Sequence, residues 1–286
     1  MSVSSRSHLP PPCRSAFAEL VRRPEESIDV AEAALLIAKE EYPELDVQAY
    51  LKRLDAMAEE VRRHLPVSGQ SRQAIDALNR FLFESQGFRG NTENYYDPRN
   101  SFLNEVLDRH TGIPITLSAI YIAVGRRAGV ALQGIGMPGH FLVKHVAGER
   151  DELLIDPFNR GKILIPEDCQ RLLDQLFQGR LRLEPGHLQV IGPRQTIARM
   201  LNNLKSIYFT AEAYSKALSI VDRLLILYPD CPDEIRDRGL LYSQVRDYRR
   251  AARDLERYLR LLPGAQDGEV IRKHLRALRE RLVGWN

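Results

Sequence analysis

The sequence has little cysteine and no long apolar run, and both absences restrict what the protein can be. Its three cysteines, Cys13, Cys169 and Cys231, are far apart and odd in number, and no C-x-x-C motif occurs. We therefore expect no disulfide framework, no metal site and no cofactor, and we expect a reducing cytoplasm as the compartment. Since no stretch of about 18 apolar residues is free of charge, we expect no transmembrane helix and no membrane partner.

The sequence also lacks a strong excess of charge of either sign. Its 286 residues include 41 Lys and Arg against 38 Asp and Glu, for a net charge of +3. Its densest basic stretch, RDYRRAARDLERYLR, is interrupted by acidic residues throughout, which is typical of a solvated helix face. Binding of nucleic acid normally requires a concentrated basic surface, so we expect no nucleic-acid partner.

The first part of the chain has the pattern of consecutive helices. Residues 1–26 begin polar and proline-rich, which predicts a flexible N-terminus. In SIDVAEAALLIAKEEYP, Ser27 or Asp29 can cap a helix that Pro43 ends. Asp46 can cap a second helix, whose apolar residues recur at helical spacing. Further helices are predicted over residues 72–86 and 101–110 and from Gly112 onward.

Short apolar runs follow these helices and predict a small sheet. The runs cover residues 130–137, 140–146 and 152–155, and the segment AGERDE is expected to form a turn between the last two. In the strand that starts at His140, alternation should direct Phe141 and Val143 into the core.

The last third of the chain repeats itself with the tetratricopeptide period. Tyr208 and Tyr242 are 34 residues apart, as are Ala217 and Ala251, and Pro229 and Pro263. We predict two such repeats, in which Arg238 replaces an expected apolar residue. A closing helix should follow, with Val270, Ile271, Leu275 and Leu278 on its inner face.

His140 and Asp156 are the two residues that can carry chemistry. A histidine next to Gly139 at the start of a strand can act as a general base, since its ordinary pKa is near neutrality. Asp156 ends the following strand and can accept a hydrogen bond from the imidazole, which would fix its tautomer. A purely structural hydrogen bond between the two is the alternative.

A nucleophile to accompany this pair is not evident. The preceding helix starts with GIPITLS, in which Thr116 and Ser118 offer hydroxyl groups. A hydroxyl ionises far less readily than a thiol, so it would need an adjacent base and an oxyanion site. Helix capping or packing is the alternative for both residues, and Cys169 has the pattern of a small buried apolar residue.

The loop GFRGNTENYYDPRN precedes that helix and is rich in amides and tyrosines. Tyr95, Tyr96, Asp97, Arg99 and Asn100 can line a binding cleft, in which Arg99 would hold a carboxylate. A hydrogen-bonded scaffold that holds the loop is the alternative.

Residues from about 27 to 178 resemble the SirB1 family, whose core is transglutaminase-like. The matching stretches are DVAEAALLIAKEEYPELDVQAYLKRLDAMA, LNRFLFESQGFRGNTENYYDPRNSFLNEVLDRHTGIPITLSAIYIAVGRRAG, GIGMPGHFLVK and IDPFNRGKIL. The resemblance implies an α+β, papain-like core of helices on a small antiparallel sheet over residues 27–190. An all-α domain of tetratricopeptide type would occupy residues 191–286, as is usual in that family.

Active transglutaminase-like proteins carry a Cys on the helix, a His on the next strand and an Asp on the following one. His140 and Asp156 match the last two members by resemblance, whereas the Cys position falls near Pro114 to Thr116, where this sequence has no cysteine. We therefore expect a non-catalytic, regulatory protein that binds a protein or peptide partner through its helical repeats. The alternative is an amide or ester hydrolase, or an acyl transferase, that uses His140 and Asp156 with a hydroxyl or water nucleophile.

Overall fold

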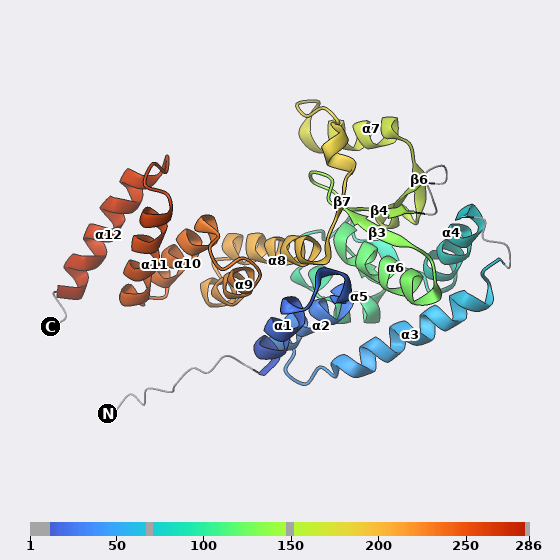
Figure 1. The fold of residues 1–286 in the computed structure, drawn as a ribbon, viewed down its shortest axis with the longest axis horizontal. Helices are drawn as coiled ribbons and strands as arrows, with labels where there is room; N and C mark the ends of the chain where they lie inside the picture. The colour runs from blue at the N-terminus through green and yellow to red at the C-terminus, as the bar shows by residue number, and fades with distance from the viewer. Residues whose placement is uncertain (1–11, 67–70, 147–151, 284–286) are drawn as a thin grey trace. The chain divides into compact units, whose positions relative to one another are not determined.

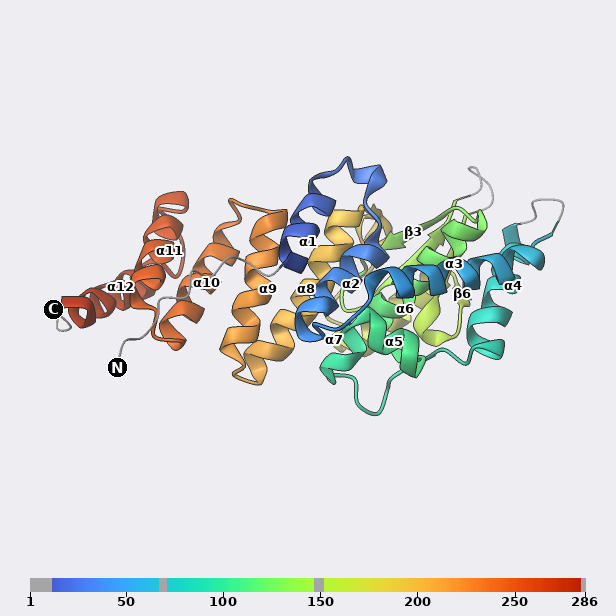
Figure 2. The same ribbon diagram turned by 90° about the horizontal axis from the view of Figure 1, so that it is seen from below.

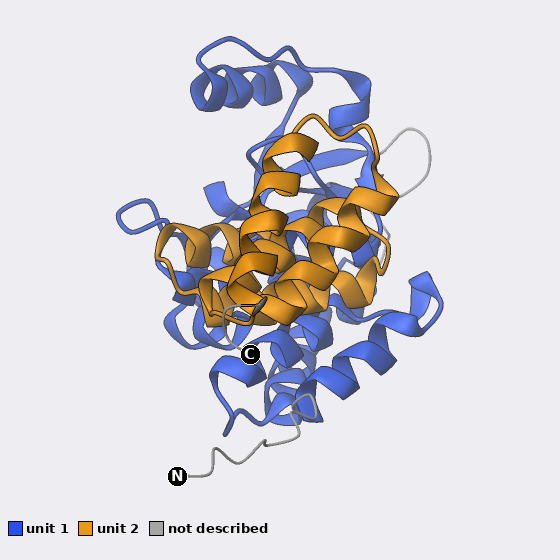
Figure 3. Cartoon of the chain, turned by 90° about the vertical axis from the view of Figure 1, so that its left-hand side faces the viewer, with its two compact units in different colours: residues 1–200 blue, residues 201–286 orange. Residues whose placement is uncertain are grey.

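The chain divides into two compact units, residues 1–200 and 201–286 (Figure 3). The structure, a computed structural model, describes residues 12–66, 71–146 and 152–283. The expected α+β core followed by an all-helical region is confirmed. From the sequence we expected the core to end at residue 190; the two units divide after Met200, within helix α8 (Pro193–Thr210).

The N-terminal region is more ordered than the sequence suggested. Residues 12–26, which we expected to belong to a flexible terminus, include helix α1 (Pro12–Arg22) and a 3-10 turn, η1 (Glu25–Ser27). Phe17, Leu20 and Val21 lie on one helical face and are buried, and α1 packs against α2 (Val30–Glu41). The polar, proline-rich start of the chain concealed this short amphipathic pattern.

The helices of the first unit form where their caps were predicted. Asp29 accepts hydrogen bonds from the first-turn amides of α2, and Asp46 caps α3 (Val47–Arg63). The remaining helices of this layer are α4 (Ser71–Asn79), a π-helical turn η2 (Arg80–Ser85), η3 (Pro98–Ser101), α5 (Leu103–Arg109) and α6 (Pro114–Ala128). Most of α6 is buried, and α3 packs along it (Figure 2). In the described part of the chain, no helix combines the length and apolar character needed to cross a membrane.

A five-stranded antiparallel sheet follows α6, in the order β6-β5-β4-β3-β7. Its strands are β3 (Leu132–Ile135), β4 (Leu142–His145), β5 (Leu153–Asp156), β6 (Lys162–Leu164) and β7 (Val190–Ile191). The first two were predicted with longer bounds, the third was predicted one residue too early, and β6 and β7 were not predicted. His140 precedes β4 instead of starting it. Most of the turn expected at AGERDE lies outside the described residues.

Helices cover both faces of this sheet (Figure 1). Helix α6 packs against β3 and β4 on one face. On the other face, α7 (Pro166–Phe177) contributes Cys169 and Leu173 to a core that includes Ile135 and Leu142. Because both faces are covered, Leu142 is buried along with Phe141 and Val143, the two residues predicted to point inward.

The second unit consists of antiparallel helix pairs of the predicted tetratricopeptide type. After α8 come α9 (Tyr214–Leu227), α10 (Pro232–Gln244), α11 (Tyr248–Leu261) and α12 (Gly268–Val283). Ala217 and Ala251, at equivalent repeat positions, are fully buried. Ile271, Leu275 and Leu278 of the closing helix are buried as predicted, but Val270 is 69% exposed, so its predicted inward position was wrong.

Candidate functional site

His140 and Asp156 are in direct contact inside the first unit. His140 Nε2 lies 3.0 Å from Asp156 Oδ2, and the two residues are only 7% and 0% exposed. Since a carboxylate only accepts hydrogen bonds, Nε2 carries the hydrogen and Nδ1 is the acceptor nitrogen of the neutral ring. Within the described residues, Nδ1 has no hydrogen-bond partner. The imidazole is therefore held in one orientation, with its acceptor nitrogen left unbonded by those residues.

Asp156 is itself held by the turn that follows β5. Its side chain caps the 3-10 turn η4 (Pro157–Asn159) and accepts hydrogen bonds from the amides of Phe158 (3.1 Å) and Asn159 (3.3 Å). The side-chain amide of Asn159 donates a further bond of 2.7 Å to Oδ2. The carboxylate thus has one fixed position relative to His140.

Asn79, at the end of α4, anchors the same turn from a distant part of the sequence. Its Nδ2 donates to the carbonyl of Gly161 at 2.9 Å, and its Oδ1 accepts from Tyr121 Oη of α6 at 3.0 Å. Sequence reasoning missed Asn79, because an asparagine within a helix carries no signal of a partner 82 residues away.

The two hydroxyl groups considered as nucleophiles are both committed to backbone contacts. Thr116 Oγ1 donates to the carbonyl of Asn100 at 2.8 Å and accepts from the amide of Ile113 at 3.1 Å. Ser118 Oγ donates to the carbonyl of Phe141 at 3.4 Å. Both residues are fully buried, and Pro114 occupies the first turn of α6. These contacts fit the capping and packing roles that were the alternative for Thr116 and Ser118.

None of the three cysteines lies on α6. Cys169 is fully buried on α7, and burial, with the nearby charges of Asp168 and Asp156, raises the pKa of its thiol to about 11. A thiol with that pKa is almost entirely protonated at neutral pH and is a poor nucleophile. Cys13 lies on α1 and Cys231 precedes α10; all three are free thiols.

Phe158 connects the His140–Asp156 pair to the amide-rich loop. Its ring meets His140 edge to face at 5.9 Å between centroids, and Tyr95 packs on it from the loop at 6.3 Å. Gly90 lies in the short strand β1 (Arg89–Gly90), which pairs with β2 (Thr111–Gly112). A Cβ at Gly90 would lie 2.6 Å from the Phe158 ring, so only glycine allows this ring to approach.

Asn100 organises the loop from within. It is fully buried, and its Nδ2 donates to the carbonyls of Asn94 (2.8 Å) and Tyr95 (3.2 Å). Its Oδ1 accepts from Asn91 and Arg109. The side chain of Asn100 therefore holds the loop together. This fits the scaffold that we considered as the alternative to ligand binding.

Asp97 and Arg99 pair with each other at the end of the loop. Arg99 Nη2 lies 2.6 Å from Asp97 Oδ2, and this hydrogen bond lowers the pKa of the Asp97 carboxyl. Arg99 is therefore already engaged by a carboxylate of its own loop.

The loop projects from the first unit (Figure 2), and Tyr96 is 77% exposed beside Tyr95. Among the loop residues predicted to line a cleft, Tyr95 and Tyr96 therefore offer exposed aromatic rings to a ligand.

Arg199 of α8 completes the surroundings of His140. Its Nη2 donates to the carbonyls of Met137 (2.9 Å) and His140 (3.0 Å), and its guanidinium lies over the Phe141 ring. Burial lowers the pKa of Arg199, an effect that Tyr95 opposes. Sequence reasoning missed Arg199, which lies 59 residues after His140.

Gly139 forms the turn before His140 with a φ of +69°. A side chain there would be strained, and its Cβ would lie 3.0 Å from Leu176 of α7. Leu176 is 50% exposed. The surroundings of His140 therefore combine an oriented imidazole, exposed apolar groups and a half-buried guanidinium.

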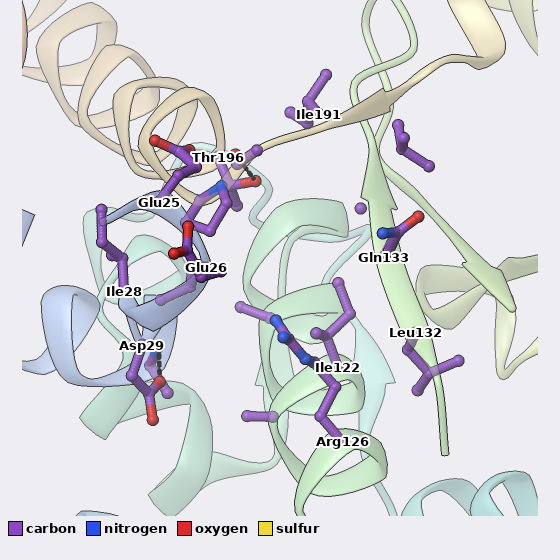
Figure 4. A pocket seen from close by; sticks show the side chains of 18 of the residues that line it. Glu25, Glu26, Ile28, Asp29, Ile122, Arg126, Leu132, Gln133, Ile191 and Thr196 are labelled. Carbon is purple, nitrogen blue, oxygen red and sulfur yellow. Dashed lines mark hydrogen bonds between the residues drawn. The ribbon is translucent and has the colours of Figure 1, made fainter. Parts of the chain in front are cut away.

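A separate hollow of about 960 Å³ lies elsewhere in the first unit, and the sequence did not predict it. It is formed by η1, the C-terminal half of α6, β3 and β7, and contains neither His140 nor Asp156 (Figure 4).

Across the residues that the structure describes, no three His, Cys, Asp or Glu side chains converge as a metal site would require.

Fold and site together define a transglutaminase-like core joined to helical repeats. Residues 48–202 match the model of the transglutaminase-like superfamily, and residues 204–276 match that of the tetratricopeptide repeat. The chain therefore belongs to the transglutaminase-like superfamily.

Its relatives are UPF0162 proteins, in agreement with the resemblance to the SirB1 family. One from Xylella fastidiosa is 37% identical over 254 residues, which cover 88% of this chain and 90% of the relative. One from Vibrio cholerae is 31% identical over 254 residues, covering 88% and 93%. Human F-box only protein 21 is 32% identical over 168 residues, which are 55% of this chain and 26% of that protein.

Proposed function

We propose that this protein is a non-catalytic, regulatory binding protein whose helical repeats hold a protein or peptide partner. The observation that carries the proposal is the first turn of α6. Pro114 lies where active relatives of this fold are expected to carry their thiol, and the hydroxyls of Thr116 and Ser118 are buried against backbone carbonyls. A base without an attacking group favours binding over turnover.

Exposed side chains of the loop and of α7 suit a ligand. Leu176, beside Gly139, and Tyr96, which packs on Tyr95 of the loop, are large and exposed, and aromatic residues are frequent at protein interfaces. Within the described residues, Arg199 has no carboxylate partner, so a ligand carboxylate can approach it. In this proposal His140 acts as a hydrogen-bonding group at the ligand.

The helical repeats supply the second part of the proposal. Repeats of this type stack into concave surfaces that bind other proteins. From the repeat register, we place Asn202, Ser206, Arg236 and Gln244 on the inner face. Three of these are exposed, and Arg236 pairs with Asp237 and Asp267. We further propose that the protein works in a reducing cytoplasm. Its three free thiols support this location.

One observation favours a second candidate, a hydrolase or acyl transferase. The 3.0 Å contact between His140 and Asp156 is the geometry of a general base with its orienting acid. In such an enzyme a water molecule would attack the amide or ester, and His140 Nδ1 would accept its proton.

The two functions separate in an activity assay on the purified full-length protein. We expect no His140-dependent turnover of generic ester and amide probes. We also expect no His140-dependent acyl transfer from a glutamine peptide to an amine. Affinity for a captured partner should fall with His140→Ala or with removal of the repeats. Turnover by the wild type that disappears in His140→Ala would overturn the binding proposal.

A further inference from the structure

We infer that the hollow between η1, α6, β3 and β7 binds a short apolar peptide with a free amino terminus and a free carboxyl terminus. This site is separate from the surroundings of His140 and does not depend on the function proposed above.

The hollow has the size and lining of a small-ligand site. Its volume of about 960 Å³ is that of a pocket for a ligand of a few residues. Its apolar lining includes Ile122 of α6, Leu132 of β3, Ile191 of β7 and Ile28, which follows η1 (Figure 4). Such a lining stabilises apolar side chains of a ligand by removing them from water.

One side of the hollow carries an acidic group without a partner. Glu25 pairs with Arg194 and accepts the amide of that residue at the start of α8. Asp29 caps α2 and pairs with Arg127. Glu26, between them in the chain, is exposed and has no cationic partner among the described residues. Its carboxylate is therefore available to an ammonium group.

The opposite charge is available on α6. Arg127 is held by Asp29 and by Asp55 at 2.9 Å. The neighbouring Arg126 is exposed and lines the hollow, and its guanidinium forms no ion pair or hydrogen bond within the described ranges. Gly125, just before it, lies so close to β3 that a Cβ would be 2.3 Å from Leu132 Cδ1. Arg126 lines the hollow together with residues of β3 and can bind a carboxylate there.

The edge of β3 adds main-chain groups to this site. The ladder between β3 and β7 ends with Gly134 opposite Ile191. The amide of Val146 donates to the carbonyl of Ala131, so alternation directs the backbone groups of Leu132 away from β4. The same register would put Pro193 opposite Leu132, and proline has no N–H to donate. A peptide backbone can occupy that position.

These groups together select a zwitterion. An ammonium at Glu26, a carboxylate at Arg126 and apolar side chains against the lining satisfy both unpaired charges. A purely anionic or purely cationic ligand would leave one of the two charges unmatched.

Titration of the isotope-labelled full-length protein tests the inference by NMR. The probe is an equimolar pool of tripeptides built from Ala, Val, Leu and Ile with both termini free, compared with N-acetylated and C-amidated pools. The free pool should shift the amide signals of Leu132 and Gly134. Acetylation or amidation should each weaken binding about tenfold, the effect of losing one charged contact.

Matched variants assign each terminus to its residue. Glu26→Gln should bind free and acetylated pools equally, Arg126→Gln should bind free and amidated pools equally, and Arg249→Gln, an exposed arginine of α11, should behave as the wild type. Absence of shifts at about 1 mM peptide would overturn the inference. Binding that responds to His140→Ala but to neither Glu26→Gln nor Arg126→Gln would also overturn it, while supporting a peptide site at His140.

Discussion

His140 and Asp156 form a buried hydrogen bond of 3.0 Å between the turn that precedes β4 and the end of β5. Three further hydrogen bonds from Phe158 and Asn159 hold the carboxylate. These bonds fix the Asp156 carboxylate in the way needed to orient a base. The start of α6, however, carries a proline and two buried hydroxyl groups in place of an accessible nucleophile. Its structural contribution can be measured separately from any chemistry.

Replacement of Asp156 should destabilise the first unit more than replacement of His140. Asp156→Ala leaves the buried imidazole of His140 and the donors of Phe158 and Asn159 without their acceptor, which should lower the free energy of unfolding by about 2–3 kcal/mol. Urea denaturation at pH 7 measures the change, with Glu167→Ala, an exposed acid, as the control. Equal losses for Asp156→Ala and Glu167→Ala would contradict this account of the turn.

Gly90 should be required for the position of Phe158. In Gly90→Ala, the new methyl group would lie 2.6 Å from the ring, so Phe158 must leave its present position against His140. Overpacking of this kind typically lowers stability by about 1–3 kcal/mol. Thermal unfolding checks the prediction. Gly186→Ala is the matched control, because a Cβ at Gly186 meets nothing within 4 Å; similar melting temperatures for the two variants would show that the close approach is unimportant.

The thiols should differ in reactivity in the order of their burial. Cys231 is partly exposed, whereas Cys169 is fully buried and has a pKa of about 11. Because the thiolate is the reactive form, iodoacetamide at pH 8 should label Cys231 first and Cys169 only after unfolding. Mass spectrometry of the digested protein measures the labelling. Rapid modification of Cys169 in the folded protein would indicate an activated thiol near Asp156.

Arg238 should stabilise the second unit although it replaces an apolar residue of the repeat pattern. Its guanidinium pairs with Asp254 through Nε at 2.7 Å and with Asp222 through Nη1 at 3.2 Å. Arg238→Ala leaves Asp254 buried without its partner, which should cost about 2–3 kcal/mol, less than for a fully buried pair because Arg238 is partly exposed.

A double-mutant cycle with Asp254→Leu tests this pair. The double variant Arg238→Ala, Asp254→Leu should lose less stability than the sum of Arg238→Ala and Asp254→Leu, since both charges are gone. The exposed pair of Arg272 and Glu269 is the control, and Arg272→Ala should change stability by less than about 1 kcal/mol. Additive losses at Arg238 and Asp254 would mean that the pair contributes nothing.

Local patterns in the sequence determined much of the fold. Asp29 and Asp46 cap their helices as predicted, because a cap depends on a side chain and the amides two or three residues away. The 34-residue spacing predicted the repeats, because each repeat is a local pair of helices. The missing cysteine at the start of α6 can also be read directly from the sequence, once the family resemblance aligns the helix.

The surroundings of His140 depend on contacts that no local pattern encodes. Asn79 reaches Gly161 across 82 residues, and Arg199 reaches the carbonyl of His140 across 59. The sheet's outer strands, β6 and β7, were missed because two or three residues are too few for a periodic pattern to appear.

By itself, the sequence determined the helices, their caps, the repeat period and which reactive groups are available, since all of these depend on neighbouring residues. Only the tertiary structure decided that Thr116 and Ser118 are bonded to distant backbone carbonyls, and that Glu26 and Arg126 face one hollow without partners among the described residues. Those relationships arise from packing between segments far apart in the chain, which sets distances and burial that sequence spacing does not contain.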